Sequence, residues 1–306
     1  MSDLLNNSFI LSHSQTSGYD FIGNIEKLIP ENNTQKWVAS YISMLSEYAS
    51  NPNYISQAIT TKSYFVKDNY VVFLESYPKT DNRLFLERKV TVNSLKSDID
   101  FKRFYCSQNP INTICVDKDF ISKIYECLLC AFLSEKTTLY FLINSSDYAE
   151  SLRNIIASFS QEILKWNSCV EILEKLPSIK ASVAACRCIF PCDKTEFIDG
   201  IKEKSNYILV DLTTDAPLID LSISSPTYAQ RSILYLLNHY RFDNIYYSIV
   251  EALNMYKISI ENKTAFFNTI CYLTTLNNFG DKIYEISMSA KEKEEINLML
   301  TKGGLL

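Results

Sequence analysis

Glycine, proline and histidine are scarce in this sequence of 306 residues, which has six glycines, eight prolines and two histidines. So few glycines and prolines argue against a solenoid of tight turns, a collagen-like segment or a long disordered linker. None of the glycines belongs to a G-x-G-x-x-G or G-x-x-x-x-G-K motif, and a backbone cradle for phosphate needs such closely spaced glycines. These absences disfavour dinucleotide-binding enzymes and P-loop enzymes.

Nucleophilic and acid/base catalysis also have little support in the sequence. The two histidines are His13 and His239, and no G-x-S-x-G motif is present. His239 ends a predicted helix, where an imidazole more often meets the terminal carbonyl groups than performs catalysis. His13 is expected in a loop or at a strand edge.

Long hydrophobic runs and strong charge of one sign are also missing. No run approaches the about 20 apolar residues that a membrane-spanning helix needs, and the polar start at Met1 does not resemble a signal peptide. The net charge is −5, and the 30 basic residues are scattered, so we expect no nucleic-acid partner. We therefore expect a soluble, cytoplasmic protein without a transmembrane segment.

Nine cysteines raise the question of a metal site or disulfides. Cys127 and Cys130 form a single C-x-x-C inside an apolar helical pattern, and the second pair that a zinc site usually has is missing. Buried, reduced thiols acting as small hydrophobic groups are the preferred interpretation, with no metal and no cofactor. A weaker alternative remains open, in which Cys186, Cys188 and Cys192 bind a metal.

Short apolar segments are the most informative feature that is present. Residues 137–144 and 206–212 are nearly continuous apolar runs between polar residues, which is typical of strands buried on both faces. Helical patterns lie between and after them. The sequence therefore predicts an α/β fold class.

The N-terminal part predicts a small α/β layer of about one hundred residues. Residues 34–50 form an amphipathic helical pattern, with Thr34 as the expected N-cap. Three β-rich segments follow at residues 63–66, 70–76 and 83–92, with a tight turn at 67–69. We expect these strands to form a meander with the helix on one face, and a domain boundary between residues 93 and 110.

The remaining chain predicts a parallel sheet followed by a helical bundle. Asp147 is the expected cap of a helix over residues 147–165, and Ser289 is expected to open the last helix. An irregular link through Pro177 should join the strand at 169–173 to the strand at 206–212. The other predicted helices are at residues 119–134, 227–240, 244–256, 263–277 and 291–300.

This order of elements resembles the DENN module preceded by a longin domain, and within that class it is similar to the folliculin family. The resemblance is carried by residues 126–141, a helix, charged turn and strand, and by the segments 169–173, 186–190 and 207–212 in that order. Further likeness lies in Ser225-Pro226-Thr227 opening a helix pair and in residues 283–294. It implies a longin-like layer at 1–110 and a DENN-like domain at 111–306, with a sheet core at 117–222 and a helical part at 226–303.

The resemblance implies a regulator of small, Rag-type GTPases that pairs with a second longin–DENN protein of the folliculin-interacting type. It also implies recruitment to the lysosome or vacuole surface through partners. Some family members use a longin-domain arginine as a finger against the transferring phosphoryl group, a role that suits an always-charged, planar guanidinium. Arg83 and Arg88 are the candidates here, although neither lies in a motif that matches the family finger. Ordinary charge at a strand edge is the alternative for both.

Two other functions stay open. A Rossmann-like transferase would bind its ligand near the strand ends at Asp147 and Asp211, because ligands of α/β folds bind there. A structural partner without GTPase contact is the third interpretation. A longin fold and a partner-dependent dimer would favour the GTPase regulator, whereas a deep polar cleft at Asp211 would favour the transferase.

Overall fold

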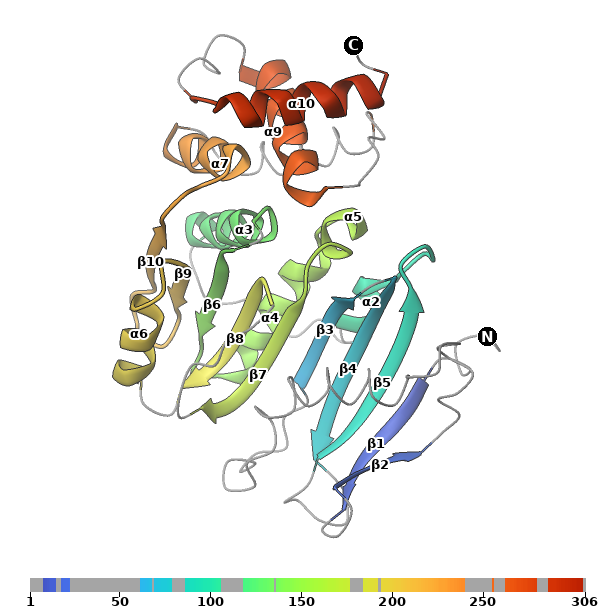
Figure 1. Ribbon diagram of the computed structural model, residues 1–306. Helices are drawn as coiled ribbons and strands as arrows, with labels where there is room; N and C mark the ends of the chain where they lie inside the picture. The colour runs from blue at the N-terminus through green and yellow to red at the C-terminus, as the bar shows by residue number, and fades with distance from the viewer. Residues whose placement is uncertain are drawn as a thin grey trace. The chain divides into compact units, whose positions relative to one another are not determined.

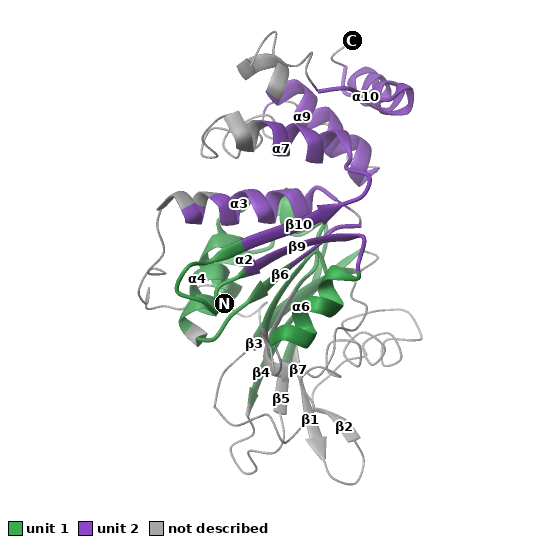
Figure 2. Ribbon diagram, turned by 90° about the vertical axis from the view of Figure 1, so that its left-hand side faces the viewer, with its two compact units in different colours: residues 1–113, 140–203, 211–218 green, residues 114–139, 204–210, 219–306 purple. Residues whose placement is uncertain are grey.

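A computed structural model shows a mixed α/β protein (Figure 1). The chain divides into two compact units (Figure 2): unit 1 comprises residues 1–113, 140–203 and 211–218, and unit 2 comprises residues 114–139, 204–210 and 219–306. The structure describes residues 8–14, 18–22, 61–67, 69–78, 86–105, 118–134, 136–176, 184–191, 194–239, 255, 262–279 and 286–304. The predicted α/β class is therefore confirmed at this coarse level, and each unit is described by itself.

An antiparallel layer forms the first part of unit 1. Its strands follow one another in the order β3-β4-β5-β1-β2 (Figure 1). The predicted meander is confirmed by β3, β4 and β5, and the earlier hairpin of β1 and β2 pairs with β5. The strands are β1 (Ser8–Ser14), β2 (Gly18–Ile22), β3 (Thr61–Lys67), β4 (Tyr70–Pro78) and β5 (Leu86–Ser94).

Strand β4 lies at the centre of this layer, between β3 and β5. Val71, Val72, Phe73 and Leu74 are all buried, so both faces of the strand are covered. Lys67 pairs with Tyr70 across the predicted tight turn, which fixes the register of β3 against β4. The helix predicted at residues 34–50 lies outside the described residues.

An aromatic cluster holds the short helix α2 (Phe101–Tyr105) against β3 and β4. The ring of Phe101 lies 5.0 Å from Tyr64 and 5.4 Å from Phe73, both in edge-on geometry. Tyr64 and Tyr105 are 6.0 Å apart between ring centroids. Edge-on aromatic pairs add to the gain from burying the rings, so this cluster is the core of the layer.

A second part of unit 1 is of mixed strand direction. Strand β7 (Cys169–Leu176) runs parallel to β8 (Cys186–Pro191) and antiparallel to β3, where Cys169 pairs with Tyr64. The parallel pair agrees with the expected parallel sheet, and β6 (Thr138–Leu142) follows β8 in the strand order. Unit 1 thus joins strands from both sides of the predicted boundary near residue 110, and the longin-like and DENN-like identities remain predictions.

The helix predicted at residues 147–165 is wrong in length, because the chain forms two helices there. Helix α4 (Ser146–Ala157) ends where Ser158 bonds back to the Ile155 carbonyl, and α5 (Gln161–Leu164) starts after a short break. Serine side chains compete with the helical backbone for hydrogen bonds, which explains an end at this position. The irregular link predicted before residue 206 is also wrong in part, since β8 and α6 (Lys194–Lys202) lie there.

Unit 2 combines two neighbouring strands with helices. The predictions at residues 119–134, 206–212, 227–240, 263–277 and 291–300 are confirmed to within two residues at each end. The strand β10 was not predicted, and the helix expected at 244–256 lies outside the described residues except for residue 255. The elements are α3 (Lys118–Phe132), β9 (Asn206–Asp211), β10 (Leu218–Ile223), α7 (Tyr228–His239), α9 (Lys263–Phe279) and α10 (Ala290–Lys302).

Helix α10 starts as predicted at Ser289. The Ser289 hydroxyl accepts a hydrogen bond from the Glu292 amide, and the Glu292 carboxylate accepts one from the Ser289 amide. This reciprocal arrangement is a capping box, which satisfies amides that the helix itself leaves without partners. Among the described helices, none is long and apolar enough to cross a membrane.

Candidate functional site

The arginine candidates of the antiparallel layer are only partly placed. Arg88 lies in β5, where its backbone pairs with Leu11 of β1 and with Ser76 of β4. Arg83 lies outside the described residues. Strand β5 is therefore paired on both sides, so Arg88 does not lie in an edge strand of the layer. The alternative that Arg88 is an ordinary charge on an edge strand is wrong. The role of Arg88 as a finger stays a prediction.

Two other arginines of unit 1, Arg187 and Arg103, differ in solvent exposure. Arg187 of β8 is fully buried, with its guanidinium 5.9 Å from the centre of the Tyr140 ring. A guanidinium in this position can make a cation–π contact but cannot reach a second protein. Arg103 of α2 is exposed, and its backbone amide bonds the Asp100 carboxylate at 2.8 Å.

Asp211 ends β9 as predicted, and its carboxylate is already occupied. One oxygen lies 2.7 Å from the Lys194 ammonium, and the other accepts hydrogen bonds from the Thr213 amide at 3.0 Å and hydroxyl at 2.6 Å. Burial alone would raise the pKa of Asp211, but these bonds from Lys194 and Thr213 lower it below the ordinary value. The geometry gives Asp211 a structural role in holding the turn after β9 and the start of α6.

Asp147 does not cap its helix, so this prediction is wrong. The N-cap of α4 is Ser145, whose hydroxyl accepts a hydrogen bond from the Asp147 amide at 3.2 Å. Asp147 lies in the first turn and is exposed, where its charge favours the helix through the macrodipole. A ligand site formed by Asp147 and Asp211 stays a prediction, and the pairing of Asp211 with Lys194 gives it no support.

Three cysteines of unit 1 share one face of the sheet. Cys169 of β7 pairs with Cys186 of β8, and Cys188 is two residues further along β8. Side chains two residues apart in a strand point to the same face, which explains why all three thiols face the same layer. All three are buried, and among the described cysteines none is in a disulfide.

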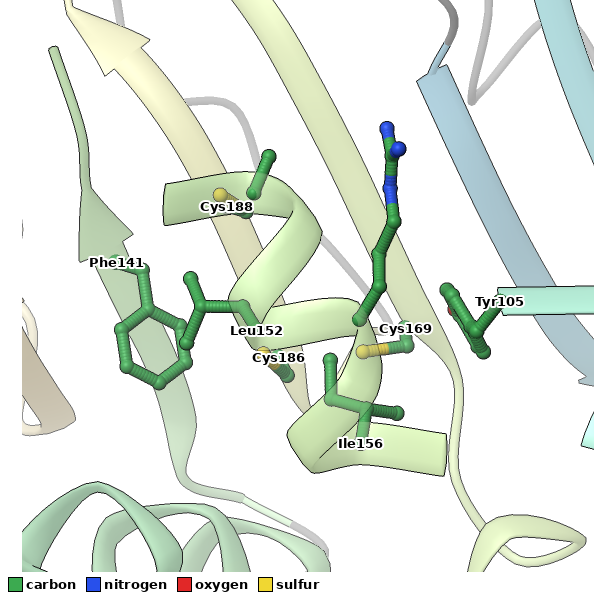
Figure 3. Close-up of a pocket in the computed structure, with 9 residues that line it drawn as sticks. Tyr105, Phe141, Leu152, Ile156, Cys169, Cys186 and Cys188 are labelled. Carbon is green, nitrogen blue, oxygen red and sulfur yellow. The ribbon is translucent and has the colours of Figure 1, made fainter. Parts of the chain in front are cut away.

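Helix α4 covers these thiols and leaves only a small void. Figure 3 shows Leu152 and Ile156 of α4 beside Cys186 and Cys169, with Tyr105 next to Cys169. The cavity between them has a volume of about 20 Å³, close to the minimum that one water molecule needs. Its lining is mostly apolar, so we regard it as a packing gap of the core and not as a ligand site.

The burial of the described cysteines agrees with their interpretation as small hydrophobic groups. Among the described residues, no group of histidine, cysteine and acidic side chains could hold a metal ion. Cys192 lies outside them, so the alternative site at Cys186, Cys188 and Cys192 stays untested. In unit 2, burial raises the pKa of Cys130 to about 12 and raises that of Cys127 further, so both remain protonated thiols.

The two histidines lie in described elements of secondary structure. His239 is the last residue of α7, as predicted, and His13 lies in β1 opposite Tyr19 of β2. The sequence interpretation missed Lys194, because the segment that contains α6 was treated as a link. Only Phe197 and Ile201 of α6 are buried, and this narrow apolar stripe gives a weak helical signal.

Comparison of the sequence with protein-family models and with curated proteins finds no match.

Proposed function

We propose that this chain regulates small, Rag-type GTPases by protein–protein contact, as a GTPase-activating or scaffolding subunit of a longin–DENN heterodimer. The observation that carries the proposal is the antiparallel layer of unit 1, in which an N-terminal hairpin pairs beside the last strand of a meander. An antiparallel layer of this kind offers a sheet edge to partners, as the proposed longin identity requires. The described chain offers little that would support chemistry of its own.

The outermost strand among those described supports pairing with a second protein. Strand β2 ends the strand order, and among the described strands it pairs only with β1. An edge strand presents backbone amides and carbonyls that another strand can bond, and this β-augmentation is a common mode of recognition. We propose that the second longin–DENN subunit binds this edge.

The GTPase-activating form of the proposal requires an arginine that reaches the phosphates of a bound partner. Arg83 precedes β5 in the sequence and Arg88 is the third residue of this strand. Of the two, only Arg88 lies among the described residues. Arg187 cannot take this role because it is fully buried. An arginine supplied to a GTPase raises the rate of hydrolysis by orders of magnitude, about 10³ to 10⁵ in known cases.

Single-turnover hydrolysis with a purified Rag-type GTPase heterodimer tests the activating role. We expect the full chain, mixed with its longin–DENN partner, to accelerate the decay of bound GTP, and Arg83→Ala or Arg88→Ala to remove most of the acceleration. Arg103→Ala is the matched control, because Arg103 is an exposed arginine of the same unit. If both variants accelerate GTP hydrolysis as much as the wild type does, neither arginine is the finger. The scaffolding role would then be the remaining form of the proposal.

A further inference from the structure

Strand β10 is an edge strand with a mostly apolar sequence. It stands at one end of the strand order, where β9 is its neighbour (Figure 1). Its sequence is Leu-Ile-Asp-Leu-Ser-Ile, and none of these residues is buried. Four large apolar side chains are exposed in the described part of the chain, and two of them belong to β10: Leu218 is 60 % exposed and Leu221 is 44 % exposed. An exposed apolar edge of this kind is a surface to which another strand can bind.

The sequence of β10 lacks residues that usually protect an edge strand. Natural edge strands often carry lysine or proline, which oppose pairing with another chain, and β10 contains neither. Asp220 is the only charged residue of the strand, and its carboxylate accepts a hydrogen bond from the Tyr207 hydroxyl of β9 at 3.5 Å. The single charge of β10 is therefore engaged by the neighbouring strand.

One hydrogen bond identifies the backbone groups of β10 that face its open edge. The Ser224 amide bonds the Asn206 side chain of β9 at 3.1 Å, so this amide points to β9. Successive backbone groups of a strand point to opposite edges, so the even-numbered residues of β10 also direct their amides and carbonyls to β9. The amides and carbonyls of the odd-numbered residues, Ile219, Leu221 and Ile223, then point to the open edge.

The sequence of β10 is complementary to itself in one antiparallel register. Two outward-facing residues can meet only if the two-fold axis between the copies passes through a residue position. The registers centred on Asp220 and on Leu221 keep the most residues of the strand paired, 218–222 and 219–223. Centring on Asp220 places two carboxylates directly opposite each other, which is destabilising.

The register centred on Leu221 avoids this repulsion. It places Leu221 opposite Leu221 of the second copy and Ile219 opposite Ile223. These side chains lie on one face of the strand, since they are two residues apart, so the pairing joins two apolar stripes. Asp220 then lies opposite Ser222, whose hydroxyl is a hydrogen-bond donor.

We propose that β10 pairs antiparallel with β10 of a second copy of this chain, in the register centred on Leu221. The amides and carbonyls of the three outward-facing residues form the hydrogen bonds, and their apolar side chains pack across the two-fold axis. A strand pair of this length is a small interface, so we expect a dissociation constant on the order of 10 µM. This interface uses a strand other than β2 and does not depend on the proposed GTPase regulation.

Sedimentation velocity of the full chain over a concentration series tests the proposal. We expect monomers at low concentration and dimers at high concentration. Leu221→Lys places two ammonium groups opposite each other at the centre of the interface and should weaken dimerisation about tenfold or more. Leu298→Lys makes the same change at a position of α10 that is 54 % exposed, and it should dimerise as the wild type does. A wild-type chain that stays monomeric well above the expected dissociation constant, or equal dimerisation of the two variants, would overturn the proposal.

A mixture of two variants tests the register itself. Leu221→Lys and Leu221→Glu each place like charges opposite each other, whereas a mixed dimer places opposite charges together. We expect the equimolar mixture to dimerise several-fold more strongly than either variant alone. The mixture of Leu298→Lys with Leu298→Glu is the control and should show no gain. A position 221 mixture that also shows no gain would contradict the pairing.

Amide hydrogen exchange of the wild-type chain provides a test that needs no substitution. The amides of Ile219, Leu221 and Ile223 should exchange more slowly at high protein concentration, because dimerisation gives them hydrogen-bond partners. The amides of Asp220 and Ser222 already face β9 and should depend less on concentration. Exchange at the three outward-facing amides that does not change with concentration would refute the proposed dimer.

Discussion

The two units contain cavities of opposite character. In unit 1 the layer between α4 and the sheet is mostly apolar, lined by three thiols, and leaves about 20 Å³ unfilled. In unit 2 the helix starts surround about 460 Å³ lined mainly by hydroxyl, amide and charged groups. The comparison shows that side chains fill the layer beneath α4 in unit 1 almost completely, whereas the helix starts of unit 2 leave a polar cavity between them.

The polar connections of unit 2 span long distances in the sequence. Gln230 donates to Thr137, 93 residues earlier, and Glu292 accepts from Tyr228, 64 residues earlier. Asn268 bonds the start of α7 from α9. Hydrogen bonds are directional, so these bonds specify which segments of unit 2 pack together. Apolar burial is not directional and specifies this arrangement less well.

Truncating the apolar layer of unit 1 should have the largest effect. Leu152 of α4 is 2 % exposed and lines the small cavity, so Leu152→Ala enlarges a void that the core cannot fill. We expect a loss of about 2–5 kcal/mol in the free energy of unfolding, measured by urea denaturation. Leu298→Ala removes the same atoms at a position 54 % exposed and should cost far less. Similar losses for the two variants would contradict the account.

Replacing the buried carboxyl group of α3 should stabilise unit 2. Burial raises the pKa of Glu126 from 4.5 to about 7, with Lys123 opposing the shift. A raised folded pKa means that the native protein holds a proton that the unfolded chain releases, so stability falls as the pH rises from about 4.5 to about 7. At pH 8 Glu126→Gln should then gain on the order of 3 kcal/mol, since one pKa unit corresponds to 1.36 kcal/mol.

Unfolding free energies at pH 5 and pH 8 check this prediction. The gain from Glu126→Gln should be small at pH 5 and full at pH 8. Glu294→Gln makes the same change at an exposed position of α10 and, as the control, should alter the free energy of unfolding little. A gain that does not depend on pH would show that Glu126 is ionised throughout this range.

Removing a long-range polar contact of unit 2 should have an intermediate effect. The Gln230 amide donates to the Thr137 hydroxyl at 2.9 Å and to the Cys130 carbonyl at 3.4 Å, and the side chain is 1 % exposed. Gln230→Ala leaves these buried acceptors without their donor and should cost about 1–3 kcal/mol. Gln161→Ala removes a more exposed amide in unit 1 and should cost less, and an equal cost for both would contradict this dependence on burial.

Loss of the cap of α10 should have the smallest effect. Ser289→Ala removes the hydroxyl that accepts from the Glu292 amide and should cost about 1 kcal/mol. Ser287→Ala, two residues earlier, keeps the backbone carbonyl that bonds Arg231 and should be nearly neutral. Thermal denaturation followed by circular dichroism measures both, and the reverse order of stability would contradict the capping geometry.

The apolar pattern of the sequence predicts much of this fold. The helices at 119–134, 227–240, 263–277 and 291–300 carry apolar residues at helical spacing, and the buried strands are short apolar runs. Strand β10 escaped prediction because none of its residues is fully buried, so its side chains do not alternate between core and solvent. The break after α4 depends on a local serine contact that the periodicity does not reveal.

The candidate sites were much harder to predict than the fold. Asp211 was found at its strand end, but its partner Lys194 was not, since their proximity is set by the tertiary structure. Polar pairing between distant segments has no periodic signal in the sequence.

Direct binding tests the proposal of GTPase regulation most sharply. The measurement is the affinity of the purified full chain, alone and with the proposed longin–DENN partner, for a purified Rag-type GTPase heterodimer loaded with GDP or with a non-hydrolysable GTP analogue. We predict saturable binding that differs between the two nucleotide states. Absence of binding in both states would contradict the proposed function.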